Sequence, residues 1–291
     1  MKILITGANG QLGSELQATC PAHVTLIPTD HESLDITQPQ QVNTVLDAHQ
    51  PDAIINAAAY TAVDKAESET ELVYAINHHA AATLAQAASQ RNIYLLHVST
   101  DFVFDGLQSS PYLPEAATQP LGVYGASKLA GEQAVQTLCP STAIVRTSWL
   151  YSAYGNNFVK TMLRLMAERD SLGVVADQSG TPTWTHTLAT TLWSFIAQKP
   201  QGIFHCSDQG VASWYDFAIA IQEEALALGL LNKAVPVKPL RTVEYPTPAR
   251  RPAYSVMDKR TTETLLGYTF PHWRVSLRQM LTELKQQIPT T

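Results

Sequence analysis

The sequence predicts an α/β fold, with a doubly wound, mostly parallel Rossmann-type sheet and a smaller C-terminal α/β part. Short apolar runs alternate with alanine-rich stretches of helical length before about residue 150, and this alternation is typical of parallel sheets with right-handed crossovers. The first apolar run leads directly into a glycine-rich turn. Beyond about residue 150, prolines interrupt shorter elements. Together these observations predict one large sheet followed by a region of shorter, proline-interrupted elements.

The first predicted strand is Ile3-Leu4-Ile5, and Gly7, Gly10 and Gly13 follow it at three-residue spacing. Such a run is typical of a buried parallel strand, and the glycines suit a tight turn into a helix whose free N–H groups bind a pyrophosphate. Gly7 would allow the turn, Gly10 would let phosphate approach the backbone, and Gly13 would let helix and strand pack closely. The spacing differs from the dehydrogenase fingerprint G-x-G-x-x-G, so a plain loop is the alternative to nucleotide binding.

The next two predicted strands, over 24–30 and 52–59, end in features that suit a nucleotide. Asp30 closes the first strand, about where a dinucleotide-binding fold contacts the adenosine ribose. The alternative for Asp30 is a loop aspartate that opens a turn. The second strand runs into small residues, over which a cofactor could lie. A long helix over 72–90 follows, and we expect Asn77 to be a local polar link in that helix rather than a ligand contact.

Tyr124 and Lys128 lie four residues apart on a predicted helix between strands over 92–98 and 142–146. Positions i and i+4 share a helix face, so we expect Lys128 to lie beside the Tyr124 ring and to lower the pKa of the phenol. A tyrosine placed in this way can pass a proton at neutral pH. A solvated helix face is the alternative reading of this pair. Thr100 follows the first of these strands, and its hydroxyl would face the same ligand crevice.

These signals divide the chain into two parts. We expect a dinucleotide-binding domain over 1–150 and a mainly substrate-binding domain over 151–291. The boundary is not clean, because part of 185–210 is apolar enough to pack back on the first sheet.

Composition excludes several classes of protein. The chain has 291 residues and no apolar stretch near the roughly 20 residues of a membrane span, so we expect a soluble protein. It begins with a core strand rather than a secretory signal, which predicts a cytoplasmic location. Cys20, Cys139 and Cys206 are isolated and predict reduced structural thiols, without a zinc site or a disulfide framework. A formal charge of -6 without a basic cluster argues against nucleic acid as a partner.

The glycine turn, Thr100 and the Tyr124/Lys128 pair resemble those of the extended short-chain dehydrogenase/reductases. Within that superfamily, four stretches are similar to the dTDP-4-dehydrorhamnose reductase family: Asn56–Glu67, Ser99–Gly106, Arg146–Trp149 and Asp177–Thr183. The resemblance covers nearly the whole chain. It implies reduction of dTDP-4-dehydro-L-rhamnose by NADPH or NADH, the last step in making dTDP-L-rhamnose for cell-surface polysaccharide such as the O antigen of lipopolysaccharide.

The resemblance also implies roles for individual residues. Tyr124 would donate a proton to the developing alkoxide, Lys128 would hold the nicotinamide ribose, and Thr100 would hydrogen-bond the carbonyl oxygen. Asp101 and Trp149 match sugar contacts, with turn capping and core filling as their alternatives. Arg251 could pair with the diphosphate or be a surface arginine. Residues that match the family's cofactor positions are Gly10, Gln11, Leu12, Asp30, Asp35, Ile36, Ala59, Tyr60 and Thr61.

Phe102 helps to choose the reaction. Related dehydratases place Asp-Glu after the threonine, and a phenylalanine cannot abstract a proton, so dehydration is disfavoured. An epimerase, or another sugar-nucleotide reductase, stays open as an alternative. A non-enzymatic function is a further alternative, because a regulatory subunit of methionine adenosyltransferase in animals resembles this family. The complete Thr100/Tyr124/Lys128 set argues against it.

Three further points stay open. An acid at position 30 usually favours NADH, yet members of the family accept both cofactors. Glu15 matches a glutamate linked to Mg²⁺ in some relatives, but one carboxylate is a poor magnesium site unless another chain adds ligands, so we expect a solvated helix residue. The chain could be a monomer or a homodimer.

Overall fold

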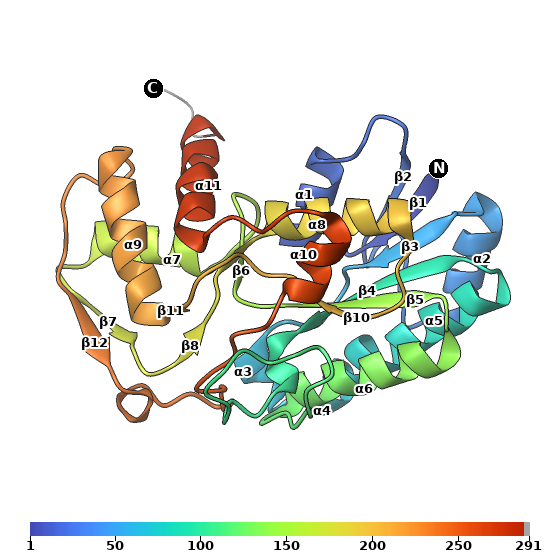
Figure 1. Cartoon of the computed structure of the whole chain (residues 1–291), viewed down its shortest axis with the longest axis horizontal. Helices are drawn as coiled ribbons and strands as arrows, with labels where there is room; N and C mark the ends of the chain where they lie inside the picture. Colours follow the sequence, from blue (N-terminus) through green and yellow to red (C-terminus); the bar gives the residue numbers. More distant parts are fainter. Residues whose placement is uncertain (288–291) are drawn as a thin grey trace.

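A parallel sheet of six strands forms the centre of the larger part of the molecule, on the right in Figure 1. The computed structural model describes residues 1–287. In spatial order the strands are β10 (Gly202–His205), β5 (Thr142–Thr147), β4 (Tyr94–Thr100), β3 (Ala53–Asn56), β1 (Lys2–Thr6) and β2 (Thr25–Thr29). All of these pairings are parallel, so the predicted fold class is confirmed. The strand order reverses between β1 and β3, which is where open α/β sheets bind ligands.

Helices cover both faces of this sheet. Ile3 and Ile5 of β1 pack under α1 (Gln11–Ala18) and α8 (Thr185–Gln198). Leu4 points to the other face, in the core shared with the remaining sheet helices. These helices are α2 (Pro39–His49), α5 (Ala81–Gln90) and α6 (Val123–Leu138). Because successive side chains of a strand point to opposite faces, a strand covered on both sides has to be apolar throughout.

The helix predicted over 72–90 is not a regular α-helix. It consists of α4 (Thr70–Tyr74), a π-helical segment (Ala75–Ala80) and α5. Asn77 lies in the π-helical segment, where its side chain accepts a bond from Tyr60 N at 2.9 Å and donates to the Ser127 hydroxyl at 3.0 Å. The prediction of a local polar link within the helix was therefore wrong, because Asn77 joins the loop after β3 to α6. Such π-helical segments are frequent near functional sites.

The smaller part, on the left in Figure 1, has its own apolar core. Three helices surround this core: α7 (Phe158–Glu168), α9 (Trp214–Ala227) and α11 (Trp273–Gln287). Its short strands pair as β7 (Leu172–Val175) with β12 (Val237–Leu240), β6 (Leu150–Tyr151) with β9 (Thr183–Trp184), and β8 (Ser179–Gly180) with β11 (Ala212–Ser213). The short helices α3 (Val63–Ala66) and α10 (Arg260–Leu266) lie outside this core. Two 3₁₀ turns, Asp101–Val103 and Thr242–Glu244, complete the elements.

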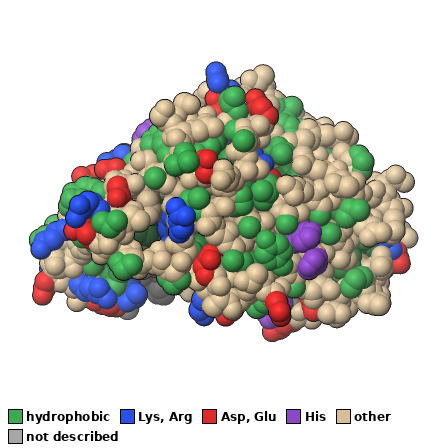
Figure 2. Space-filling view, turned by 90° about the horizontal axis from the view of Figure 1, so that it is seen from below, with side chains coloured by type: hydrophobic (Ala, Val, Ile, Leu, Met, Phe, Trp, Pro, Cys, Tyr) green, Lys and Arg blue, Asp and Glu red, His purple; other side chains and the backbone are tan. Residues whose placement is uncertain are grey.

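The surface carries charges of both signs. On the face shown in Figure 2, basic side chains stand out mainly over the smaller part and alternate with acidic ones. No helix within residues 1–287 is both long and apolar enough to cross a membrane. Cys20, Cys139 and Cys206 are free thiols.

Candidate functional site

One pocket of about 980 Å³ lies at the carboxyl edge of the large sheet and reaches the smaller part. Its walls come from the ends of β1, β3, β4 and β5 and from the first turns of α1 and α6. Trp214, at the start of α9, closes it from the smaller part. A volume of this size is within the usual range of ligand pockets.

The glycine turn has the geometry that its sequence predicts. Gly7 has a φ of 70°, which only glycine adopts without strain. Gly10 is the N-cap of α1, no side chain caps the first N–H groups of this helix, and the first turn of the helix lines the pocket. A Cβ on Gly13 would lie 2.2 Å from the Gly7 carbonyl oxygen, which shows how closely strand and helix pack. Gln11 and Leu12 line the same end of the pocket.

Asp30, Asp35 and Ile36 line the pocket beyond this turn. Asp30 directly follows β2, and its carboxylate accepts hydrogen bonds from the Ser33 backbone and hydroxyl and from the Asn9 amide. These hydrogen bonds lower the pKa of Asp30, and those from Ser33 have the largest effect. Hydrogen bonds from Thr37 lower the pKa of Asp35 in the same way. Asp30 also opens the turn through Ser33, so the two readings of this aspartate are compatible.

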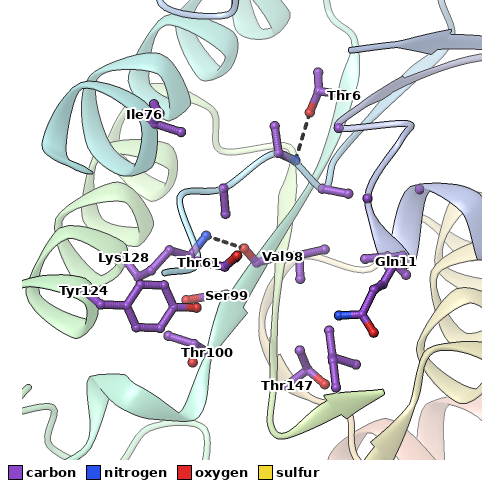
Figure 3. Close-up of a pocket in the computed structure, with 18 of the residues that line it drawn as sticks. Thr6, Gln11, Thr61, Ile76, Val98, Ser99, Thr100, Tyr124, Lys128 and Thr147 are labelled. Atoms are coloured by element: carbon purple, nitrogen blue, oxygen red, sulfur yellow. Dashed lines mark hydrogen bonds between the residues drawn. The ribbon is translucent and has the colours of Figure 1, made fainter. Parts of the chain in front are cut away.

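The loop after β3 brings Ala59 and Thr61 to the pocket wall. Thr6 holds the start of this loop, because its hydroxyl accepts a bond from Ala58 N at 3.3 Å (Figure 3). The Tyr60 hydroxyl donates to Glu69 at 2.6 Å. The Tyr60 side chain is therefore engaged with Glu69.

Thr100, Tyr124 and Lys128 lie together in the pocket (Figure 3). Thr100 ends β4, and the other two residues lie on the first turns of α6. Figure 3 shows the Tyr124 ring pointing toward Ser99 and Thr100. The Lys128 side chain is buried, and its Nζ donates to the Val98 carbonyl at 2.7 Å.

The ionisation of this pair differs from the sequence-based expectation. Burial raises the pKa of Tyr124 to about 12, the Thr100 hydrogen bond opposes this, and the charge of Asp101 adds to it. Burial lowers the pKa of Lys128 to about 8, against the opposing charge of Glu132. The expectation of a lowered phenol pKa was therefore wrong, because removal from water favours the neutral phenol and outweighs the charge of Lys128. A phenol that keeps its proton at neutral pH can still give it to a stronger base, such as a developing alkoxide.

Asp101 lies next to the catalytic candidates and is buried. Its Oδ1 accepts a hydrogen bond from the Thr100 hydroxyl at 3.1 Å, and burial raises the pKa of Asp101 to about 6. The following turn is capped by Thr100, whose hydroxyl oxygen accepts from Phe102 N at 3.2 Å. The Thr100 hydroxyl therefore has to turn its proton away from Asp101 before it can donate to a ligand.

Trp149 and Arg251 both reach the pocket. Trp149 is half-buried, stacks on Trp214 and packs against the edge of the core of the smaller part. Two N–H groups of Arg251 donate to the Asp64 carboxylate at 3.0 and 2.7 Å. The Arg251 contact lowers the pKa of Asp64. Arg251 is thus held by an ion pair at the pocket and is not a free surface arginine.

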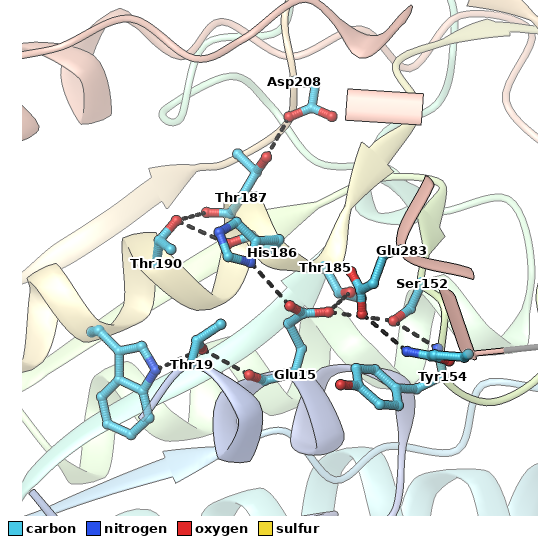
Figure 4. A network of polar contacts seen from close by, with 12 residues as sticks. Glu15, Thr19, Ser152, Tyr154, Thr185, His186, Thr187, Thr190, Asp208 and Glu283 are labelled. Carbon is cyan, nitrogen blue, oxygen red and sulfur yellow. Dashed lines mark hydrogen bonds and ion pairs between the residues drawn. The ribbon is translucent and has the colours of Figure 1, made fainter. Parts of the chain in front are cut away.

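Glu15 is buried, so the expectation of a solvated helix residue was wrong. Its carboxylate accepts from the Thr185 hydroxyl at 2.9 Å and lies 3.1 Å from His186 Nδ1 (Figure 4). The hydrogen bond with Glu15 raises the pKa of His186, and burial together with the Glu15 charge raises that of Glu283. Within residues 1–287, no group of three or more His, Cys, Asp and Glu side chains is arranged to hold a metal ion. In this chain, Glu15 connects α1 to α8.

Sequence reasoning missed the aromatic wall of the pocket formed by Phe158 and Trp214. Both residues follow helix-capping side chains, Asn157 and Ser213. These caps could have located the helix starts, but not their distance from the catalytic residues. Glu67 was also missed: its Oε1 accepts from Val123 N at 2.9 Å and so caps the helix that carries Tyr124.

Comparisons with known proteins agree along nearly the whole chain. The family described as the RmlD substrate binding domain matches residues 1–286. A dTDP-4-dehydrorhamnose reductase of Aggregatibacter actinomycetemcomitans is 44% identical, over 96% of this chain and 98% of the relative. The enzyme of the same name from Escherichia coli K12 is 43% identical, over 98% of both chains. This chain belongs to the RmlD family.

Solved structures of the family have the same architecture. The dTDP-4-dehydrorhamnose reductase of Clostridium acetobutylicum superimposes with a TM-score of 0.93 at 44% identity, over 98% of this chain and 100% of that one. The Bacillus anthracis enzyme, solved in complex with NADP, superimposes with a TM-score of 0.92 at 41% identity, over 97% of this chain and 99% of that one. A UDP-glucose 4-epimerase of Thermus thermophilus shares the fold, with a TM-score of 0.84 at 16% identity.

Proposed function

We propose that this chain reduces the ketone of dTDP-4-dehydro-L-rhamnose to dTDP-L-rhamnose with NADPH or NADH. The observation that carries this proposal is the meeting of the glycine turn with Thr100, Tyr124 and Lys128 in one pocket. Membership of the RmlD family supports the choice of substrate, because relatives with 44% and 43% identity are named for this reduction.

The residues at one end of the pocket fit a dinucleotide. The uncapped N-terminus of α1 would bind the pyrophosphate, and a side chain on Gly10 would project into the space that phosphate needs. Asp30 would bind the adenosine ribose. Its charge would oppose the 2′-phosphate of NADPH, yet a relative with 41% identity was solved with NADP. We therefore propose that both cofactors are used.

At the other end, the bound cofactor would supply the hydride, and the protein would supply the proton. Tyr124 would donate its phenolic proton to the oxygen of the reduced ketone. Thr100 would hold the carbonyl oxygen in place, after release from Asp101. Lys128 would bind the nicotinamide ribose, and its charge would stabilise the tyrosinate that proton transfer leaves behind.

The rest of the substrate would lie toward the smaller part. Asp101 and Trp149 would contact the sugar. Arg251, oriented by Asp64, would bind the diphosphate with its remaining donors, since a guanidinium carries five N–H groups. Phe102 packs edge-on against the Tyr124 ring, with the centroids 5.4 Å apart, and so provides packing where a dehydratase would carry an acid or base.

The test is to mix the protein with dTDP-4-dehydrorhamnose and each reduced nucleotide, and to follow the nicotinamide absorbance. We expect steady oxidation of the reduced nucleotide, in proportion to the sugar added, with dTDP-L-rhamnose as the product. An epimerase would convert its substrate without net consumption of added cofactor, and that result would overturn the proposal.

We place the reaction in the cytoplasm, with a monomer or homodimer as the working unit.

A further inference from the structure

Trp149 has an unusual backbone conformation. Its φ is 46°, in the left-handed region that a bulky side chain rarely adopts. Such a conformation persists only where the surroundings enforce it, and it is often found at binding and catalytic sites. Trp149 lies between β5 and β6, separated from the end of β5 by Ser148, at the boundary between the two parts of the molecule.

The segment Asp177–Thr183 holds the backbone around Trp149 from both sides. The Ser148 hydroxyl donates to the Thr181 carbonyl at 2.8 Å, and Thr183 N donates to the Trp149 carbonyl at 3.2 Å. Strands β6 and β9 continue this pairing beyond the turn. The proposed reaction leaves this segment without a role.

The Trp149 ring is held as firmly as its backbone. It stacks on Trp214 with the ring centroids 3.6 Å apart and the planes 5° from parallel. A Cβ on Gly180 would lie 2.6 to 2.8 Å from three atoms of the indole, so any other residue there has to displace the ring. Pairing of Gly180 with Ala212 in the β8–β11 ribbon brings the start of α9, and with it Trp214, to the same place.

We propose that Gly180 and Trp214 are positioning residues that hold the Trp149 indole in the orientation that binds the sugar of the substrate. This inference rests on the proposed function, because it takes Trp149 as a sugar contact. Gly180 provides the space for the ring. Trp214 provides the aromatic surface against which the ring stacks, and this stacking stabilises the orientation of the indole. Neither residue has to touch the hydride or the proton that is transferred.

The test is a double-mutant cycle between Gly180→Ala and Trp149→Ala. Gly180→Ala alone should raise the KM for dTDP-4-dehydrorhamnose about tenfold, through displacement of the indole, with NADPH affinity within about twofold of wild type. In a Trp149→Ala background the same change should have no further effect on KM, because the ring that it displaces is absent. Gly173→Ala is a matched control, since Gly173 is exposed and its Cβ would meet only the Leu240 side chain.

A second cycle combines Trp214→Leu with Trp149→Ala, and Trp214→Phe serves as the conservative variant. Leucine should raise KM, and phenylalanine should restore most of the affinity by keeping an aromatic surface. Calorimetric titration with dTDP-L-rhamnose measures the same affinities without turnover. If Gly180→Ala melts below the assay temperature, this Trp214 cycle decides the question.

Additive KM effects in both cycles would overturn the inference while leaving the reaction assigned. A wild-type protein that binds the dTDP-sugar but does not oxidise NADPH would instead overturn the proposed function.

Discussion

Raising the pH from about 7 to about 9 should slow sugar reduction about tenfold, because Lys128 loses its charge in this interval. Burial lowers the pKa of Lys128 to about 8, and an amine is charged below its pKa. The charged fraction therefore falls from about ten in eleven to about one in eleven across this range. The pKa of Tyr124 is about 12, so the phenol keeps its proton throughout and does not contribute to this limb. The rate should follow the lysine alone.

The assay is the initial rate of NADPH oxidation at low substrate concentration, since kcat/KM reports the ionisation of the free enzyme. The Lys128→Arg variant is the control, because a guanidinium stays charged at every pH used. Whatever its absolute rate, its pH profile should lack the decline. A wild-type rate that stays constant between about pH 7 and 9, with NADPH affinity also constant, would refute the role given to the Lys128 charge.

Four substitutions test other parts of the site. Tyr124→Phe should remove nearly all turnover but leave NADPH affinity close to wild type. Retention of half the wild-type rate would contradict the proton-donor role. Gly10→Val should weaken NADPH binding much more than it lowers the melting temperature, because a Cβ there meets only the Gly7 carbonyl oxygen, at 3.3 Å. Gly13→Ala should lower the melting temperature instead, since its Cβ would overlap backbone atoms; equal effects of these two glycine changes on stability would contradict the assigned turn. Phe102→Leu should keep substantial reduction, at a packing cost of about 1 kcal/mol. The wild-type protein should form no 4-keto-6-deoxy sugar from dTDP-glucose and NAD⁺, as detected by analysis of the products.

Local sequence patterns were sufficient for the elements that position the cofactor. An apolar strand, a glycine turn and a helix within the first 18 residues form a local unit, so their spacing along the chain already determines their geometry. The i, i+4 spacing likewise placed Tyr124 and Lys128 on one face of α6. The π-helical segment around Asn77 was not foreseen, because its bonds to Tyr60 and Ser127 span 17 and 50 residues.

The burial of a charged group depends on which distant segments cover it, and the sequence contains no local signal of that. Glu15 lies on an ordinary amphipathic helix, yet residues from 137 to 171 positions away surround its carboxylate. In the same way, burial gives Tyr124 a higher pKa than its spacing to Lys128 predicts, because the loss of water outweighs a charge four residues away.

The sequence by itself determined the fold class, the cofactor turn and the catalytic candidates, since each depends on residues close together in the chain. Only the tertiary structure decided how Trp149 is held, because Gly180 and Trp214 reach it through strand pairing between separate segments. It also decided that Arg251 is held by Asp64, across 187 residues of chain. Contacts of this kind come from packing the two parts of the molecule together, and packing depends on all of the surfaces that meet.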